Sequence, residues 1–155
     1  MSEIPKIFST LFYLGYIKWA PGTIGSLLSI IIIILLHNFL NKIVFIIFFI
    51  FIFVLAIIFV SLYSKSINKH DASEIVIDEF LGIYLIMIFS YNSILVNDFL
   101  NIFLIFILFR FFDITKPYPI NWINSNIKNS YGIILDDILA GIYTIITLTI
   151  LNAFI

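Results

Sequence analysis

The chain has 155 residues, of which 63% are hydrophobic and 11% are charged, and its formal net charge is −1. This composition excludes recruitment of nucleic acid, because no basic tract is present to neutralise phosphates. The absence of cysteine excludes disulfides, thiolate metal sites and a cysteine nucleophile. With a mean hydropathy of +1.19, residues 1–155 are predicted to form one membrane-embedded domain.

The hydropathy pattern predicts an all-α fold, a polytopic membrane bundle of about five apolar helices. The first two come from one apolar stretch, residues 27–60, which as a single helix would reach roughly 50 Å, well beyond a hydrocarbon core of about 30 Å. The stretch must therefore fold back, and its polar residues 37–42 are the expected turn. The predicted helices cover residues 24–41, 42–63, 80–96, 99–112 and 133–154.

The third and fourth predicted helices are short for complete membrane spans. They either tilt, thin the bilayer locally, or form a re-entrant hairpin around residues 92–98. Loops are expected at Pro21-Gly22 and around Pro117 and Pro119. Charged residues and a proline spread over residues 1–19 do not match a cleaved secretory signal.

The distribution of basic residues predicts the topology. If the amino terminus is cytoplasmic and each helix crosses once, seven of the eight lysines and arginines lie on the cytoplasmic side and only Lys42 lies outside. This is the positive-inside pattern. Among the acidic residues only Asp98 falls outside, so the acidic residues of three separate segments are expected to gather at one membrane face.

Acidic residues interrupt three of the apolar segments, at Asp78, Glu79, Asp113, Asp136 and Asp137. A charge at membrane depth costs a few kcal/mol or more, so such residues indicate a functional site. Carboxylate oxygens without thiolates suit a hard divalent cation, which predicts Mg²⁺ bound by these five side chains. The adjacent pair Asp136-Asp137 points in directions about 100° apart on a helix, so one carboxylate faces a metal while the other contacts a second ion, a water or a cation.

Local capping rules offer a structural explanation for two other acidic residues. Asp71 and Glu74 are spaced as a capping box at the start of a helix, and this spacing would also place them on one helix face with Asp78. Asp78 and Glu79 are expected one turn further in, where capping does not explain them. His37 and His70 are not expected to bind metal, because imidazole sites usually combine several soft ligands.

Basic and small residues near the acidic residues predict a phosphate site. Arg110 is three residues before Asp113, a spacing that fits either a salt bridge or a functional role. Lys116 lies in a proline-stiffened loop, where its ammonium could neutralise a phosphate oxygen. Gly22 and Thr23 belong to a Pro-Gly turn at a helix start, which presents free N–H groups to an anion.

Four stretches, APGTIGSL, EIVIDEFLG, FRFFDITKPYPI and GIILDDILAGIY, resemble in order and spacing the phosphatidylglycerophosphatase A family. The resemblance implies a multi-pass enzyme of the bacterial inner membrane that uses Mg²⁺ to hydrolyse phosphatidylglycerophosphate to phosphatidylglycerol and phosphate at the cytoplasmic face. No obligate protein partner is implied. The implied catalytic residues are Asp71, Asp78, Glu79, Lys116, Asp136 and Asp137, and the implied phosphate-binding residues are Gly22, Thr23, Arg110 and Lys116.

Other functions fit the pattern less well. A membrane cation transporter would also use intramembrane carboxylates, but these acidic residues gather near one face instead of along a path. A CDP-alcohol phosphotransferase would need a longer aspartate-rich motif, and a non-catalytic subunit would not need the acidic residues. The sequence lacks a DxDx(T/V) motif, so attack by metal-activated water is favoured over an aspartyl-phosphate intermediate.

Overall fold

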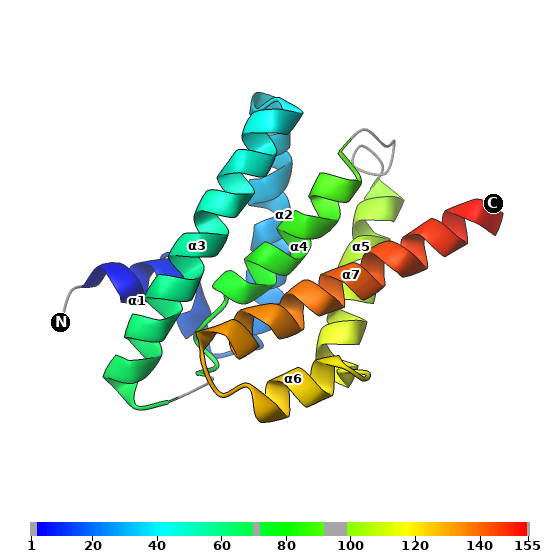
Figure 1. Ribbon diagram of the computed structural model, residues 1–155. Coiled ribbons are helices and arrows are strands. Elements are labelled where there is room, and N and C mark those ends of the chain that lie inside the picture. Colours follow the sequence, from blue (N-terminus) through cyan, green and yellow to red (C-terminus); the bar gives the residue numbers. More distant parts are fainter. Residues whose placement is uncertain (1–2, 70–71, 92–98, 155) are drawn as a thin grey trace.

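The computed structural model describes residues 3–69, 72–91 and 99–154, and every regular element in this part of the chain is a helix (Figure 1). The all-α prediction is therefore confirmed. The helices are α1 (Glu3–Ser9), η1 (Leu14–Tyr16), α2 (Pro21–Phe39), α3 (Lys42–Ile67), α4 (Ile77–Phe89), α5 (Phe99–Thr115), α6 (Ile120–Asn126) and α7 (Ser130–Phe154). Hydropathy did not predict α1, η1 and α6, which are too short to give a strong periodic signal.

Among the described residues, α2, α3 and α7 are long and apolar enough to cross a membrane. The predicted turn between the first two spans is confirmed, because α2 ends at Phe39 and α3 begins at Lys42. The shorter α4 and α5 have 13 and 17 residues. The expectation of a helix over 80–96 was wrong at both ends, since α4 covers Ile77–Phe89. The hairpin considered around residues 92–98 lies outside the described residues.

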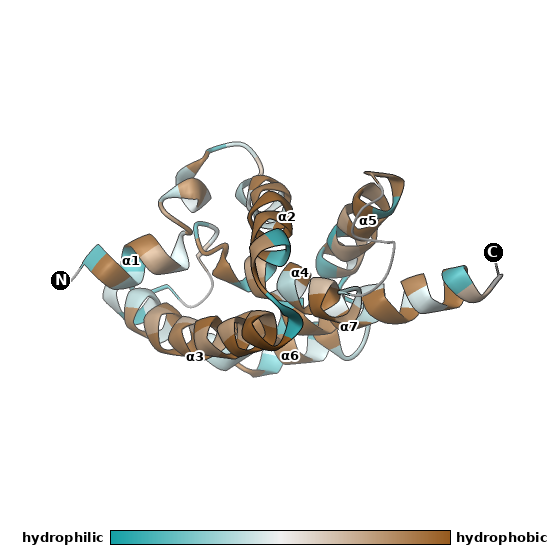
Figure 2. Ribbon diagram, turned by 90° about the horizontal axis from the view of Figure 1, so that it is seen from above, coloured by the Kyte–Doolittle hydropathy of each residue, from teal (hydrophilic) through white to brown (hydrophobic). Residues whose placement is uncertain are grey.

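The apolar surface of α3 fits a lipid environment. Hydrophobic residues cover this helix and much of α2, α5 and α7 (Figure 2). On α3 the side chains of Ile47 and Phe51 are 60% and 57% exposed, an arrangement that water would disfavour and hydrocarbon would not.

The centre of the bundle is α4, which packs against α2, α3, α5 and α7 and lies between α3 and α7 in Figure 1. Ten of its 13 residues are buried. The hydroxyl of the fully buried Tyr84 donates a hydrogen bond of 3.0 Å to the carbonyl of Phe45, near the start of α3. The polar end of this side chain is therefore satisfied inside the apolar core.

The start of α4 differs from the expected capping box. The helix begins at Ile77 after Val76, and no side chain caps it. Glu74 lies outside the helix and accepts a hydrogen bond of 3.3 Å from the Tyr63 hydroxyl. The expected helix face shared by Asp71, Glu74 and Asp78 was therefore wrong, and Asp71 lies outside the described residues. Asp78 and Glu79 were expected one turn into the helix, but they occupy its first turn, where the helix dipole favours carboxylates.

Two glycines let α4 and α7 approach closely. A Cβ on Gly141 would lie 2.7 Å from the carbonyl oxygen of Gly82, and a Cβ on Gly82 would lie 2.7 Å from the carbonyl oxygen of Asp137. Both distances are below van der Waals contact, so only glycine fits at either position. The close crossing brings Asp137 of α7 beside the first turn of α4.

We expect Gly141→Val to destabilise the protein by about 1–3 kcal/mol, because the added side chain must push α7 away from α4. Thermal unfolding in detergent measures this loss. The matched control is Ile142→Val, which places valine at the next position of the same helix, where the side chain is 38% exposed. Equal melting temperatures for the two variants would contradict the close crossing.

Candidate functional site

A polar hollow of about 240 Å³ lies where the starts of α2, α4 and α7 meet the end of α5. It contains charged side chains from all of these elements except α2, which contributes Pro21 and Gly22. Its lining residues are Pro21, Gly22, Ala72, Ser73, Ile75, Asp78, Glu79, Arg110, Asp113, Lys116, Ile133, Asp136 and Asp137.

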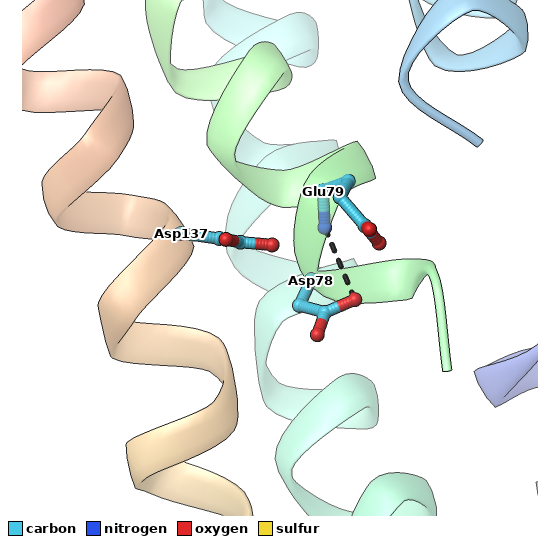
Figure 3. A group of neighbouring side chains, drawn as sticks. All are labelled: Asp78, Glu79 and Asp137. Carbon is cyan, nitrogen blue, oxygen red and sulfur yellow. Dashed lines mark hydrogen bonds between the residues drawn. The ribbon is translucent and has the colours of Figure 1, made fainter. Parts of the chain in front are cut away.

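Three buried carboxylates form the inner part of this hollow. Asp78, Glu79 and Asp137 each present one oxygen, and these three oxygens lie within 4.8 Å of one another. The residues are 8%, 8% and 4% exposed, so water screens their mutual repulsion poorly. In Figure 3, Asp137 reaches from α7 towards the first turn of α4, which carries the other two. This group of carboxylate oxygens is a candidate site for a metal ion.

The donor atoms of this cluster fit a hard divalent cation. All are carboxylate oxygens, the ligands that Mg²⁺ prefers, and together they form a group that could hold one metal ion. The buried Glu79 Oε2 has no hydrogen-bond partner among the described residues, so it has a coordination position to offer. Asp78 Oδ1 accepts a 3.1 Å hydrogen bond from the backbone N–H of Glu79, which orients the Asp78 carboxylate (Figure 3).

Arg110 lies at the edge of the carboxylate cluster. Its Nη1 atom is 2.5 Å from Asp113 Oδ2 and 3.8 Å from Glu79 Oε1. The salt bridge between residues 110 and 113 is thereby confirmed, and Arg110 additionally faces the cluster. Its buried Nε has no hydrogen-bond partner in the described part of the chain. The Nε–H group of Arg110 is therefore available to donate a hydrogen bond to a further acceptor near the hollow.

Lys116 is the second cation of the hollow. Its Nζ atom donates a 2.5 Å hydrogen bond to Asp136 Oδ2. The residue adopts the left-handed backbone conformation, with φ of 41°, which costs about 1 kcal/mol or more for a residue with a Cβ. Burial alone would lower the pKa of Lys116, but its hydrogen bond to Asp136 and the charge of that carboxylate raise the pKa above its ordinary value. Lys116 therefore stays protonated at neutral pH.

The neighbours Asp136 and Asp137 serve different partners, as their helical spacing predicts. Asp137 joins the cluster with Asp78 and Glu79, whereas Asp136 holds the ammonium of Lys116. Asp113 likewise pairs with Arg110. The structure thus gathers the five predicted acidic residues in one hollow, but only three of them form the compact group of oxygens.

The first turn of α2 lines the hollow with the backbone of Gly22 and not with the hydroxyl group of Thr23. Gly22 lines the hollow, and a Cβ on this residue would collide with Glu79 Oε1 and lie 3.1 Å from Arg110 Nη1. Pro21 is the first residue of α2, a position where its missing N–H costs no helical hydrogen bond. Thr23, which the sequence predicted to contact phosphate, is not among the lining residues.

Some predicted residues lie elsewhere. His37 is in the last turn of α2, with its Nε2 atom 3.1 Å from the carbonyl oxygen of Tyr91, and does not line the acidic hollow. Asp71 and His70 lie outside the described residues. The sequence did not predict the roles of Gly82 and Gly141, although each follows an acidic pair by about one helical turn, and this repeated spacing is a signal for close helix packing.

Comparisons with known proteins agree with the motifs. Residues 7–152 match the family model described as phosphatidylglycerophosphatase A. A Haemophilus influenzae protein named phosphatidylglycerophosphatase A is 36% identical over 135 residues, which is 87% of this chain and 80% of the relative. An Escherichia coli protein of the same name is 33% identical over 79 residues, 51% of this chain and 44% of the relative.

A third relative carries a different name. A Bacteroides thetaiotaomicron protein named "Putative phosphatidylinositol-3-phosphatase" is 32% identical over 152 residues, which is 96% of this chain and 94% of the relative. Both names describe removal of a phosphate from a phospholipid. No solved structure gives a significant match to the chain.

Proposed function

Because the chain belongs to the phosphatidylglycerophosphatase A family and is a phosphatase, we propose that it hydrolyses the phosphomonoester of phosphatidylglycerophosphate with the aid of Mg²⁺. The products are phosphatidylglycerol and inorganic phosphate. The observation that supports this proposal most strongly is the buried group of three carboxylates with two cationic side chains beside it. Such a site can bind a metal cation and the anionic phosphate together.

In this proposal Asp78, Glu79 and Asp137 hold the metal. Bound there, Mg²⁺ would supply positive charge to neutralise the phosphate oxygens and would favour deprotonation of the attacking water. The chain itself supplies Arg110 and Lys116, whose positive charges stabilise the negative charge on the nonbridging oxygens. The absence of a side chain at Gly22 lets Glu79 and Arg110 pack directly against the backbone at the start of α2, where a Cβ would collide with Glu79 Oε1.

We assign positioning roles to the two remaining acidic residues. Asp113 and Asp136 each hold one cation through a 2.5 Å contact, so that Arg110 and Lys116 are oriented before substrate binds. This assignment revises the expectation that both bind metal. A water molecule is proposed as the nucleophile, and no aspartate is assigned a covalent intermediate.

A transporter would use the same carboxylates differently. It would need polar groups along a path between the two membrane faces. In the described residues, Asp78, Glu79, Asp136 and Asp137 lie in the first two turns of α4 and α7, and Asp113 lies in the last turn of α5. The acidic residues therefore cluster at one end of the bundle, which favours the enzyme.

The proposed reaction is tested by phosphate release from detergent-solubilised protein. We expect release from phosphatidylglycerophosphate that stops in EDTA and resumes with added Mg²⁺ or Mn²⁺. Phosphatidylinositol 3-phosphate with matched acyl chains is the comparison substrate, and we expect it to react more slowly. Faster hydrolysis of the inositol lipid would overturn the substrate assignment, and full activity in EDTA would overturn the metal requirement.

We further propose that the hollow faces the cytoplasm at the bacterial inner membrane, where seven of the eight basic residues would lie. The cysteine-free chain allows a direct test with single cysteines. Single cysteines that replace Lys69, Tyr118 or Lys128 should react with an impermeant reagent from the cytoplasmic side. A cysteine that replaces Lys42 should react from the opposite side. Labelling of positions 42 and 118 from the same side would contradict this topology.

A further inference from the structure

A second hollow, of about 250 Å³, has three lysines among its lining residues and lies apart from the carboxylates. Lys65 is in the last turn of α3, Lys69 follows that helix, and Lys128 precedes α7. Among the described residues none of the three forms an ion pair with a carboxylate. The hollow therefore concentrates positive charge that its described surroundings do not neutralise.

The ends of two helices build this hollow. Asn68 adopts the left-handed conformation with φ of 53°, and the backbone N–H groups of Asn68 and Lys69 both donate to the carbonyl of Ser64. This turn folds Lys69 back beside the last turn of α3. Asn129 also lines the hollow, and its Oδ1 accepts hydrogen bonds from two backbone N–H groups in the first turn of α7, which fixes the start of that helix.

Helix electrostatics explains only part of this arrangement. Lys65 and Lys69 lie at the carboxyl end of α3, where the helix dipole favours cations. Lys128 lies two residues before the 25-residue helix α7, at the positive end of its dipole, where a cation is unfavourable. Its Nζ atom donates a hydrogen bond of 2.9 Å to the carbonyl of Asn124, and the ammonium group has two further N–H donors. An anion in the hollow would compensate all of these positive charges.

The position of the hollow indicates the kind of anion. α3 is long and apolar enough to span the membrane, so its end marks the level of the lipid headgroups. Lysines at that level attract anionic lipids. Ser130 lines the lysine hollow, and Ile133, one helical turn further along α7, lines the carboxylate hollow. The two hollows are therefore neighbours at the same end of the bundle.

We propose that the hollow formed by Lys65, Lys69 and Lys128 binds the headgroup phosphate of an anionic phospholipid. The lysine ammonium groups contact the phosphate oxygens, and the acyl chains extend along the apolar surface of α3. This binding site is separate from the carboxylate hollow, and it does not depend on the proposed hydrolysis.

Native mass spectrometry of the purified chain in detergent tests this site. Phosphatidylserine is compared with phosphatidylcholine of the same acyl chains, and we expect tighter binding of phosphatidylserine. The triple variant Lys65→Gln, Lys69→Gln, Lys128→Gln should weaken phosphatidylserine binding about tenfold or more. The corresponding triple arginine variant should keep it.

The matched control removes the same total charge elsewhere, through Lys6→Gln, Lys18→Gln and Lys42→Gln, and should keep phosphatidylserine binding. Equal losses in the two glutamine triple variants would overturn the proposal, because they would indicate general charge attraction. Unchanged binding in the first variant would overturn it as well. A titration with inorganic phosphate distinguishes the source of the anion: phosphate adducts that form as readily as lipid adducts on the same lysines would contradict a lipid site.

Discussion

Replacing Asp137 with asparagine is expected to lower the turnover of phosphatidylglycerophosphate on the order of a hundredfold or more, with Asp78→Asn similarly affected. Each substitution keeps the size of the side chain and removes one negative charge from the three-carboxylate cluster. The remaining two carboxylates then attract a divalent cation less strongly. The measurement is phosphate release at saturating substrate over a range of Mg²⁺ concentrations.

Folding is the necessary control for this loss. Both variants should keep the helical content of the wild type and melt no lower without metal, because removing one buried charge relieves repulsion in the cluster. Glu74→Gln is the control for loss of an acidic side chain, since Glu74 lies outside the carboxylate hollow and accepts a hydrogen bond from the Tyr63 hydroxyl. A folded Asp137→Asn protein with wild-type activity would contradict the assignment of Asp137 to the metal site. An inactive Glu74→Gln protein would contradict it as well, because activity would then also be lost when a carboxylate outside the hollow is removed.

The second large effect is expected at Lys116. Lys116→Gln should lower kcat by about a hundredfold, because one positive charge beside the phosphate is lost. The same change leaves Asp136, which is 5% exposed, without its ammonium partner and should also lower the melting temperature.

A double variant separates the two consequences of losing Lys116. Lys116→Gln combined with Asp136→Asn removes both charges of this ion pair, so it should regain thermal stability while staying inactive. Recovery of both stability and activity would show that Lys116 acts only as the partner of Asp136. Lys42→Gln, at the opposite end of the bundle, is the control for loss of a lysine and should keep full activity.

The sequence predicted the long elements, and the five acidic residues that it singled out lie in one hollow of the structure, because both features depend on strong local signals. Long, mainly apolar stretches identify α2, α3 and α7, and acidic residues inside apolar helices are conspicuous. The confirmed contact between Arg110 and Asp113 is also local, since residues three apart on a helix are neighbours.

Contacts between distant segments were harder to predict. The start of α4 at Ile77 depends on the preceding turn, where the backbone N–H of Val76 donates to the carbonyl of Ser9, a partner far away in the sequence. Which acidic residues join the three-carboxylate cluster and which pair with Arg110 or Lys116 also depends on tertiary packing. The close contact of Gly82 with α7 brings Asp137 to the α4 carboxylates, and the left-handed backbone of Lys116 accompanies its contact with Asp136.

In the proposed function, Asp78, Glu79 and Asp137 form the metal site of the enzyme. Electron paramagnetic resonance of added Mn²⁺ tests it directly, because free and protein-bound Mn²⁺ give different spectra. We expect wild-type protein and Glu74→Gln to bind Mn²⁺ and Mg²⁺ to displace it, whereas Asp78→Asn and Asp137→Asn should bind at least tenfold more weakly. Equal Mn²⁺ binding by wild type and Asp137→Asn, both folded, would contradict the claim.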